Sequence, residues 1–79
     1  MIDVKKDIRY VVAMMSDVPM FLFRNFTGQY AFTDNISVAV KTFDKYTAKQ
    51  IIKQYIEQSG DHCSMTILPI EISYKIAED

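Results

Sequence analysis

The chain has 79 residues and a mass of 9.2 kDa, which suits a single domain spanning residues 1–79. Nine basic and ten acidic residues give a formal net charge of −1, which excludes the general attraction to nucleic acid or anionic membranes that a strongly basic domain has. The hydrophobic fraction of 49% and the charged fraction of 24% argue against disorder. Domains this small often gain stability by self-association, so an oligomer is one of the states that we expect for this chain.

The N-terminal half predicts a β-hairpin followed by a third extended stretch. Residues 8–15 form a β-branched and aromatic run that is apolar on both faces, as in a central strand. The Ser-Asp pair that follows favours a turn, in a loop of three to five residues. Residues 20–26 predict the second strand. Gly28 then breaks the apolar run, and residues 29–32 predict a short third strand.

A short helical turn and then a long helix are predicted next. Three consecutive capping residues, Thr33-Asp34-Asn35, favour a helical turn over residues 36–40, with extended structure as the alternative. Residues 45–58 carry apolar side chains at spacings of three, four, seven and eight, which predicts an amphipathic helix. Asp44 would cap its start, Phe43 would pack against its first turn, and Gly60 would end it.

The C-terminal segment, residues 65–76, predicts a half-buried strand, because apolar and polar residues alternate in its second half. Pro69 within it argues for an edge position, a bulge or a break. The element order β-β-(α)-α-β therefore predicts an α+β fold. We expect a mainly antiparallel sheet of three to four strands with one amphipathic helix packed on one face.

Residues from the predicted hairpin to the predicted helix resemble small proteins of phages and prophages. In those proteins a "TDN-I…A…F…A" stretch joins a hairpin to a helix. The likeness covers about residues 8 to 56 and rests on the following residues: Tyr10-Val11-Val12, the Phe-rich second strand, Thr33-Asp34-Asn35-Ile36, Ala39, Phe43 and Ala48. It implies a phage accessory or host-takeover protein, a class that includes inhibitors of bacterial defence, and it transfers no catalytic residue.

The residues favour neither an enzyme nor a metal or cofactor site. His62 and Cys63 are the single histidine and cysteine, and as neighbours in extended chain they point to opposite faces, which suits a base and nucleophile poorly. A zinc site needs three or four ligands, and one chain offers too few soft ones. With one cysteine, no secretion signal in MIDVKKDIRY and no apolar run near the roughly 20 residues that cross a bilayer, we expect a cytoplasmic protein without membrane association.

Four lysines, Lys41, Lys45, Lys49 and Lys53, recur every four residues. They form a nearly continuous basic stripe if the helix extends back to the first of them. Such a stripe suits contact with nucleic-acid phosphates or with an acidic protein surface. The simpler interpretation is a solvated helix face opposite the apolar stripe.

The second predicted strand is rich in aromatic residues, and Phe21 and Phe23 on an exposed sheet could stack bases, as in single-strand binders. Arg24 is the only cation beside them. We expect core packing for at least half of the aromatic side chains and a protein interface for any that are exposed.

Our leading hypothesis is a non-enzymatic interaction protein that binds a protein partner or associates with itself through an edge strand. The alternative is contact with nucleic acid through the lysine stripe. The candidate partner-binding residues are Lys41, Lys45, Lys49, Lys53, Arg24, Phe21 and Phe23.

Overall fold

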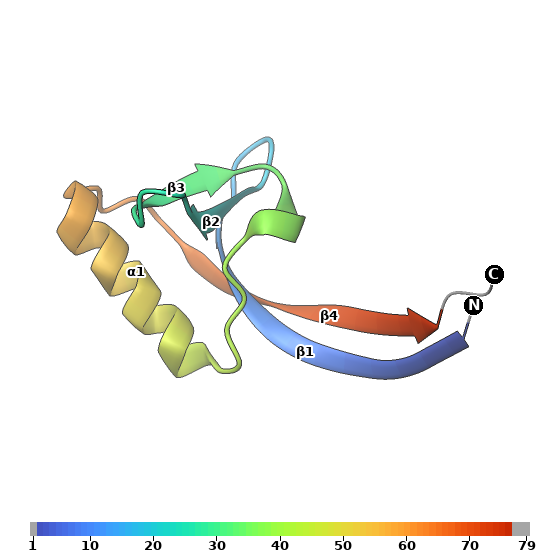
Figure 1. The fold of residues 1–79 in the computed structure, drawn as a ribbon. Helices are drawn as coiled ribbons and strands as arrows, with labels where there is room; N and C mark the ends of the chain where they lie inside the picture. Colours follow the sequence, from blue (N-terminus) through green and yellow to red (C-terminus); the bar gives the residue numbers. More distant parts are fainter. Residues whose placement is uncertain (1, 77–79) are drawn as a thin grey trace.

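A computed structural model describes residues 2–76, and side chains are described for residues 6–74. The elements are β1 (Ile2–Met14), β2 (Met20–Arg24), β3 (Tyr30–Thr33), the 3-10 helix η1 (Ile36–Val38), α1 (Lys45–Ser59) and β4 (Thr66–Ile76). The four strands form one antiparallel sheet in the order β3-β2-β1-β4, and α1 packs across one face of it (Figure 1). The predicted α+β fold, with a four-stranded sheet and one amphipathic helix, is confirmed.

β1 is central, as predicted, but it begins at Ile2 rather than at residue 8. The additional residues are mostly charged and carry no strand pattern of their own. They become a strand because β4 pairs with them on both sides of a β-bulge between Asp3 and Lys5. β4 lies at the edge of the sheet, as Pro69 indicated, and the loop of residues 15–19 before β2 has the expected length.

β2 ends at Arg24, two residues earlier than predicted, because the Asn25 side chain organises a turn. Its Oδ1 accepts hydrogen bonds from the backbone N–H groups of Thr27 and Gln29, at 3.1 and 3.0 Å. Gly28 completes the turn with a φ of 86°, which glycine adopts without strain. β3 consequently begins and ends one residue later than predicted.

The predicted caps of α1 are present. The Asp44 carboxylate accepts a hydrogen bond from the Thr47 N–H at 2.7 Å, and this bond holds the pKa of Asp44 below its ordinary value. Gly60 ends the helix at a φ of 71°, and its N–H donates to the Ile56 carbonyl at 2.8 Å. Within residues 2–76, no helix is long and apolar enough to span a bilayer.

Two local predictions before α1 had different outcomes. The short helical turn is confirmed as η1, which Asn35 caps by accepting from the Ser37 N–H at 3.1 Å. The packing of Phe43 against the first turn of α1 is wrong, because this side chain is 78% exposed. Its ring instead lies 4.1 Å from the guanidinium carbon of Arg9 on β1, a cation–π contact.

The hydrophobic core lies between the sheet and α1. Its central members are Val12, Leu22, Ala48, Ile51 and Tyr55, with Phe32 and other half-buried side chains around them. The rings of Phe32 and Tyr55 meet edge to face, with centroids 5.2 Å apart. The cluster joins residues of α1 to residues of the strands, so the helix covers the sheet as the amphipathic pattern predicted.

The segment of residues 39–42 fills a fork in the sheet. β1 and β2 pair only beside the loop that connects them, and then they diverge. In the gap, the Val40 N–H donates to the Leu22 carbonyl at 3.1 Å, while Thr42 and Tyr10 exchange two backbone hydrogen bonds of 2.9 Å. These bonds fix the chain that leads into α1 at a defined place beside the helix.

Beyond the fork, residues 2–8 of β1 and 71–76 of β4 continue as a two-stranded ribbon, which we call the arm. Figure 1 shows the arm extending away from α1, with both ends of the described chain at its tip. The molecule is accordingly elongated, with extents of 48 × 27 × 23 Å.

Candidate binding groove

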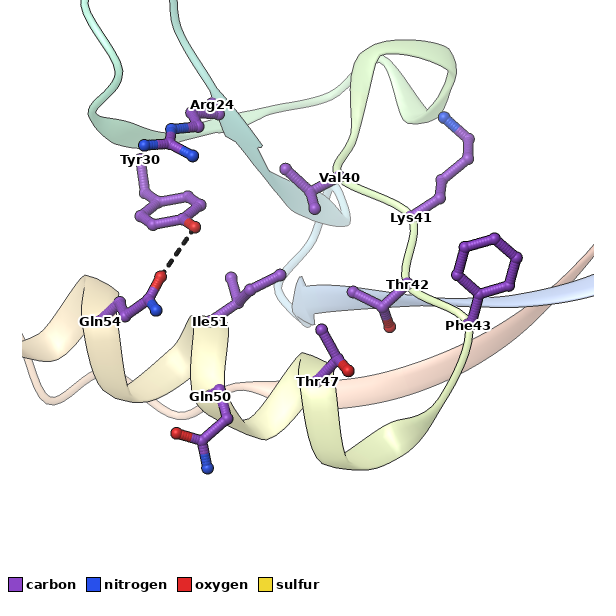
Figure 2. Close-up of a pocket in the computed structure, with 10 residues that line it drawn as sticks. All are labelled: Arg24, Tyr30, Val40, Lys41, Thr42, Phe43, Thr47, Gln50, Ile51 and Gln54. Carbon is purple, nitrogen blue, oxygen red and sulfur yellow. Dashed lines mark hydrogen bonds between the residues drawn. The ribbon is translucent and has the colours of Figure 1, made fainter.

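An open groove of about 470 Å³ lies between α1 and the segment that fills the fork in the sheet (Figure 2). Three layers of the fold contribute to it: the β2–β3 hairpin, the chain from residue 40 to 43, and one side of the helix. Ten residues line it: Arg24, Tyr30, Val40, Lys41, Thr42, Phe43, Thr47, Gln50, Ile51 and Gln54.

The floor of the groove is apolar and firmly held. Ile51 is 8% exposed and belongs to the core, and Val40 packs against the same cluster. Thr42 is 5% exposed, and its hydroxyl donates to the Asp44 carbonyl at 2.9 Å, which ties the groove wall to the start of α1. The floor is therefore already ordered before a ligand binds, and binding loses little free energy to its ordering.

Two glutamines fasten α1 to β3 at the far end of the groove. The Tyr30 hydroxyl donates to Gln54 Oε1 at 2.9 Å, the dashed line in Figure 2. The Gln58 side chain accepts from the Tyr30 N–H at 2.9 Å and donates to the Tyr30 carbonyl at 3.0 Å. Three hydrogen bonds, of its hydroxyl, N–H and carbonyl, consequently fix Tyr30, and its ring forms one wall of the groove.

The charge of the groove is positive. Arg24 supplies this charge, and no carboxylate is among the ten lining residues. Lys41 also lines the groove, but its ammonium points away toward η1 (Figure 2). The Arg24 guanidinium carbon lies 5.6 Å from the centre of the Tyr30 ring, and its Nε donates to the Gly28 carbonyl at 3.1 Å. In a chain with a net charge of −1, a site with this lining attracts anionic groups.

The predicted lysine stripe is shorter than expected. α1 begins at Lys45, so Lys41 precedes the helix and lies in the fork segment instead. Its ammonium donates to the carbonyls of Ser37 and Ala39, at 2.9 and 3.1 Å. A basic series of three exposed lysines remains on α1: Lys45, Lys49 and Lys53.

The two phenylalanines proposed as partner contacts lie on the face of the sheet opposite α1. Leu22 between them is 1% exposed and faces the helix, so Phe21 and Phe23 point the other way. Both are half-buried. Arg24 is therefore the one residue of this strand segment that the fold brings into the groove, and the candidates predicted from the sequence do not form one surface.

His62 and Cys63 lie in the loop between α1 and β4. His62 is exposed, whereas Cys63 is half-buried and packs against the core. Burial, and then the nearby Asp61 carboxylate, raise the pKa of the Cys63 thiol, so the reactive thiolate is disfavoured at neutral pH. The carboxylate also accepts from the Tyr55 hydroxyl at 3.1 Å. No cluster of three metal-ligating side chains occurs among the residues that the structure describes.

One pattern that points to the groove, a series of three glutamines, was missed in the sequence analysis. Gln50, Gln54 and Gln58 recur every four residues along the helix, on a line parallel to the lysines. Two of them meet Tyr30, which is more than twenty positions earlier in the chain. Comparison with protein-family models, with curated proteins and with solved structures yielded no match.

Proposed function

We propose that this chain is a non-enzymatic protein-binding module, and that its groove takes a partner segment in which an acidic residue stands beside an apolar one. The composition of the groove carries the proposal. Val40 and Ile51 offer an apolar floor, Tyr30 a fixed aromatic wall, and Arg24 the positive charge. Tyrosine and arginine around an apolar centre are the residues that dominate binding energy at protein interfaces.

The rigidity of the groove supports the same proposal. Tyr30 is already held by Gln54 and Gln58, and the fork segment by backbone hydrogen bonds to β1 and β2. A partner would lose little affinity to the ordering of these groups, since they are fixed before binding. An apolar floor beside fixed charges also favours one orientation of the bound segment.

Two further points belong to this proposal, one from Cys63 and one from the predicted resemblance. The Cys63 thiol has a raised pKa and packs against the core, which suits a structural side chain better than a nucleophile. The likeness to small phage and prophage proteins suggests a setting, in which the partner would be a host protein or a component of bacterial defence. We include this setting in the proposal.

Selection from a displayed peptide library against the immobilised full chain tests the proposed specificity. We expect enriched peptides to carry Asp or Glu within a few residues of Leu, Ile or an aromatic residue. Binding of a selected peptide should weaken at least about tenfold in Arg24→Glu, because the attraction becomes repulsion. NMR shifts on binding should centre on Tyr30 and Ile51.

Lys53→Glu is the matched control, because it makes the same change of charge on α1 outside the groove. We expect it to keep most of the affinity. Selected peptides without acidic residues, or equal losses in Arg24→Glu and Lys53→Glu, would rule out recognition by the groove.

Contact with nucleic acid is the second proposal, and the exposed series Lys45, Lys49 and Lys53 favours it. Three phosphate contacts predict modest affinity that falls as salt rises. Titration of single- and double-stranded DNA and RNA at low salt is the test, with the triple lysine-to-glutamine variant as control. No binding at low salt, or equal binding by the variant, removes this second proposal without affecting the groove.

A further inference from the structure

We propose that two copies of this chain pair through the outer edge of β4, antiparallel and with the twofold axis at Ile72. The outer edge of β4 is unpaired in the described sheet, and the β4 side chains Ile70, Ile72 and Tyr74 lie on the face that α1 leaves uncovered, beside Asp7 and Arg9 of β1. The site is separate from the groove and does not depend on the function proposed for it.

The hydrogen bonds of Tyr10 show which residues of β4 direct their backbone N–H and carbonyl groups to its outer edge. Its N–H and carbonyl are both bonded to Thr42, on the side of β1 away from β4. Tyr10 therefore makes no backbone bond to Pro69, which lies opposite it, and the backbone groups of Pro69 point outward. Because the direction alternates along a strand, those of Glu71 and Ser73 also point outward.

Pro69 limits where another strand can add. Its missing N–H falls on the outer edge, where a second strand would require a donor. Near the body of the domain this edge is thus interrupted, whereas Glu71 and Ser73 further along present complete N–H and carbonyl pairs. A second strand can therefore pair with the arm part of β4 but not with the part around Pro69.

The arm also lacks the cover that the body of the sheet has. Val11 and Ala13 of β1 are 0% exposed, but Ile8 is 50% exposed and Tyr74 is 45% exposed. Ile72 lies on the same face as Tyr74, opposite the α1 side. An isolated two-stranded ribbon is marginally stable in water, so added strands on this edge would stabilise the arm.

The side chains of the arm complement a second copy when Ile72 lies on the axis. On one face, Ile72 then meets Ile72 of the second copy, and Ile70 meets Tyr74 of the second copy. Aromatic and β-branched cross-strand pairs of this kind stabilise sheets. All three side chains lie on the sheet face that α1 leaves uncovered.

The opposite face of the same register brings unlike polar groups together. Glu71 lies across from Ser73 of the second copy, whose own neighbour on β1 is Lys6. Lys6 already pairs with Glu71 of its own chain at 3.5 Å, with both side chains more than half exposed. Each Glu71 would therefore lie between two lysines. A register centred on Glu71 would instead oppose two carboxylates.

The outer edge of β1 is a poorer choice. Between residues 6 and 8 its outward groups belong to Lys6 and Ile8, by the same alternation, and nearer the tip a β-bulge between Asp3 and Lys5 interrupts the edge. Antiparallel pairing centred on Asp7 or Lys6 opposes like charges. Pairing centred on Ile8 needs the backbone of Tyr10, which is bonded to Thr42.

Sedimentation velocity or light scattering of the full chain over a range of concentrations tests the dimer. We expect a species of twice the 9.2 kDa chain mass at high concentration. Ile72→Lys should give monomer throughout, since it places two ammonium groups at the axis. Ile8→Lys, the same change on an exposed residue of the arm away from the seam, should keep the dimer. A wild-type chain that stays monomeric, or an Ile8→Lys variant as defective as Ile72→Lys, overturns the proposal.

Disulfide crosslinking tests the register and does not require Ile72→Lys to fold. In a Cys63→Ser background, Ile72→Cys should oxidise rapidly to a covalent dimer, because opposed Cα atoms about 4.5 Å apart suit a disulfide. Ser73→Cys faces Glu71 of the second copy and should crosslink at least about tenfold more slowly. Faster crosslinking at residue 73 than at 72, or none at either, contradicts this register.

Discussion

β1 passes through two different environments within a few residues. Its buried part belongs to the body that stabilises the domain, and its exposed part belongs to the arm, which is available to a binding partner. At Val11 the strand lies between β4 and the rest of the body, and the side chain is 0% exposed. At Ile8 the sheet has narrowed to two strands without helix cover, and the side chain is 50% exposed. The hydrogen-bonded ladder to β4 is continuous through both. Strand pairing alone therefore does not bury a side chain. Burial, and with it most of the stability, depends on the elements that pack around the paired strands.

The largest effect should come from the body. Leu22 is 1% exposed under α1, so Leu22→Ala should lower the free energy of unfolding by about 2–5 kcal/mol, through lost burial and a cavity. Ile8→Ala in the arm should change it by no more than about 0.5 kcal/mol. Urea denaturation at a concentration where the chain is monomeric measures both. Equal costs for the two variants would contradict the distinction between body and arm.

A smaller change in the free energy of unfolding is expected at Gly60, which ends α1 before the chain continues into β4. A Cβ at Gly60 would meet no atom within 4 Å, so the cost of Gly60→Ala is backbone strain alone at a φ of +71°. We expect a loss of about 1–2 kcal/mol in thermal or urea unfolding. Gly60→Asn should lose less, because asparagine tolerates the left-handed region. A neutral Gly60→Ala would show that the helix ends differently.

The smallest effect should come from the exposed cap of α1 at the edge of the groove. The hydrogen bond from Thr47 lowers the pKa of Asp44 from its ordinary value of 3.8, so the cap stabilises the fold fully above that value. The stabilisation is lost as the pH falls through the lower pKa of the folded state. Asp44→Ala should thus lower the urea midpoint at pH 7, and the difference from wild type should shrink in acid.

Asp44→Asn serves as the control for this prediction, since asparagine caps helices about as well as aspartate without titrating. We expect it to retain most of the midpoint at pH 7. A difference between wild type and Asp44→Ala that persists unchanged below the ordinary pKa of a carboxyl would mean that the cap acts by other means.

The features predicted correctly from the sequence depend on local interactions. Asp44 and Gly60 lie within four residues of the groups they bond, and the amphipathic period of α1 is local as well. The N-terminal half of β1 could not be predicted, because its charged residues become a strand only when β4 pairs with them. Phe43 was misplaced for a related reason, since its contact is Arg9, far back in the chain.

The candidate site was predicted less completely than the fold. Lys41 was expected in a helical stripe if the helix extended back to it, but the chain is extended there because it pairs with β1 and β2 in the fork. Tyr30 and Gln54 meet only after α1 has packed on the sheet. Arg24 and Lys41 were named as candidate contacts, and both line the groove. Nothing in their spacing predicts that they share a site.

Backbone amide exchange in the arm, followed by NMR at low and high protein concentration, tests most directly whether the arm is a pairing surface. The Ile72 N–H faces β1 and should be protected at both concentrations. The N–H groups of Glu71 and Ser73 face outward and should exchange freely in dilute solution, then slow markedly as the concentration rises. Free exchange of both outward amides at every concentration would contradict the account.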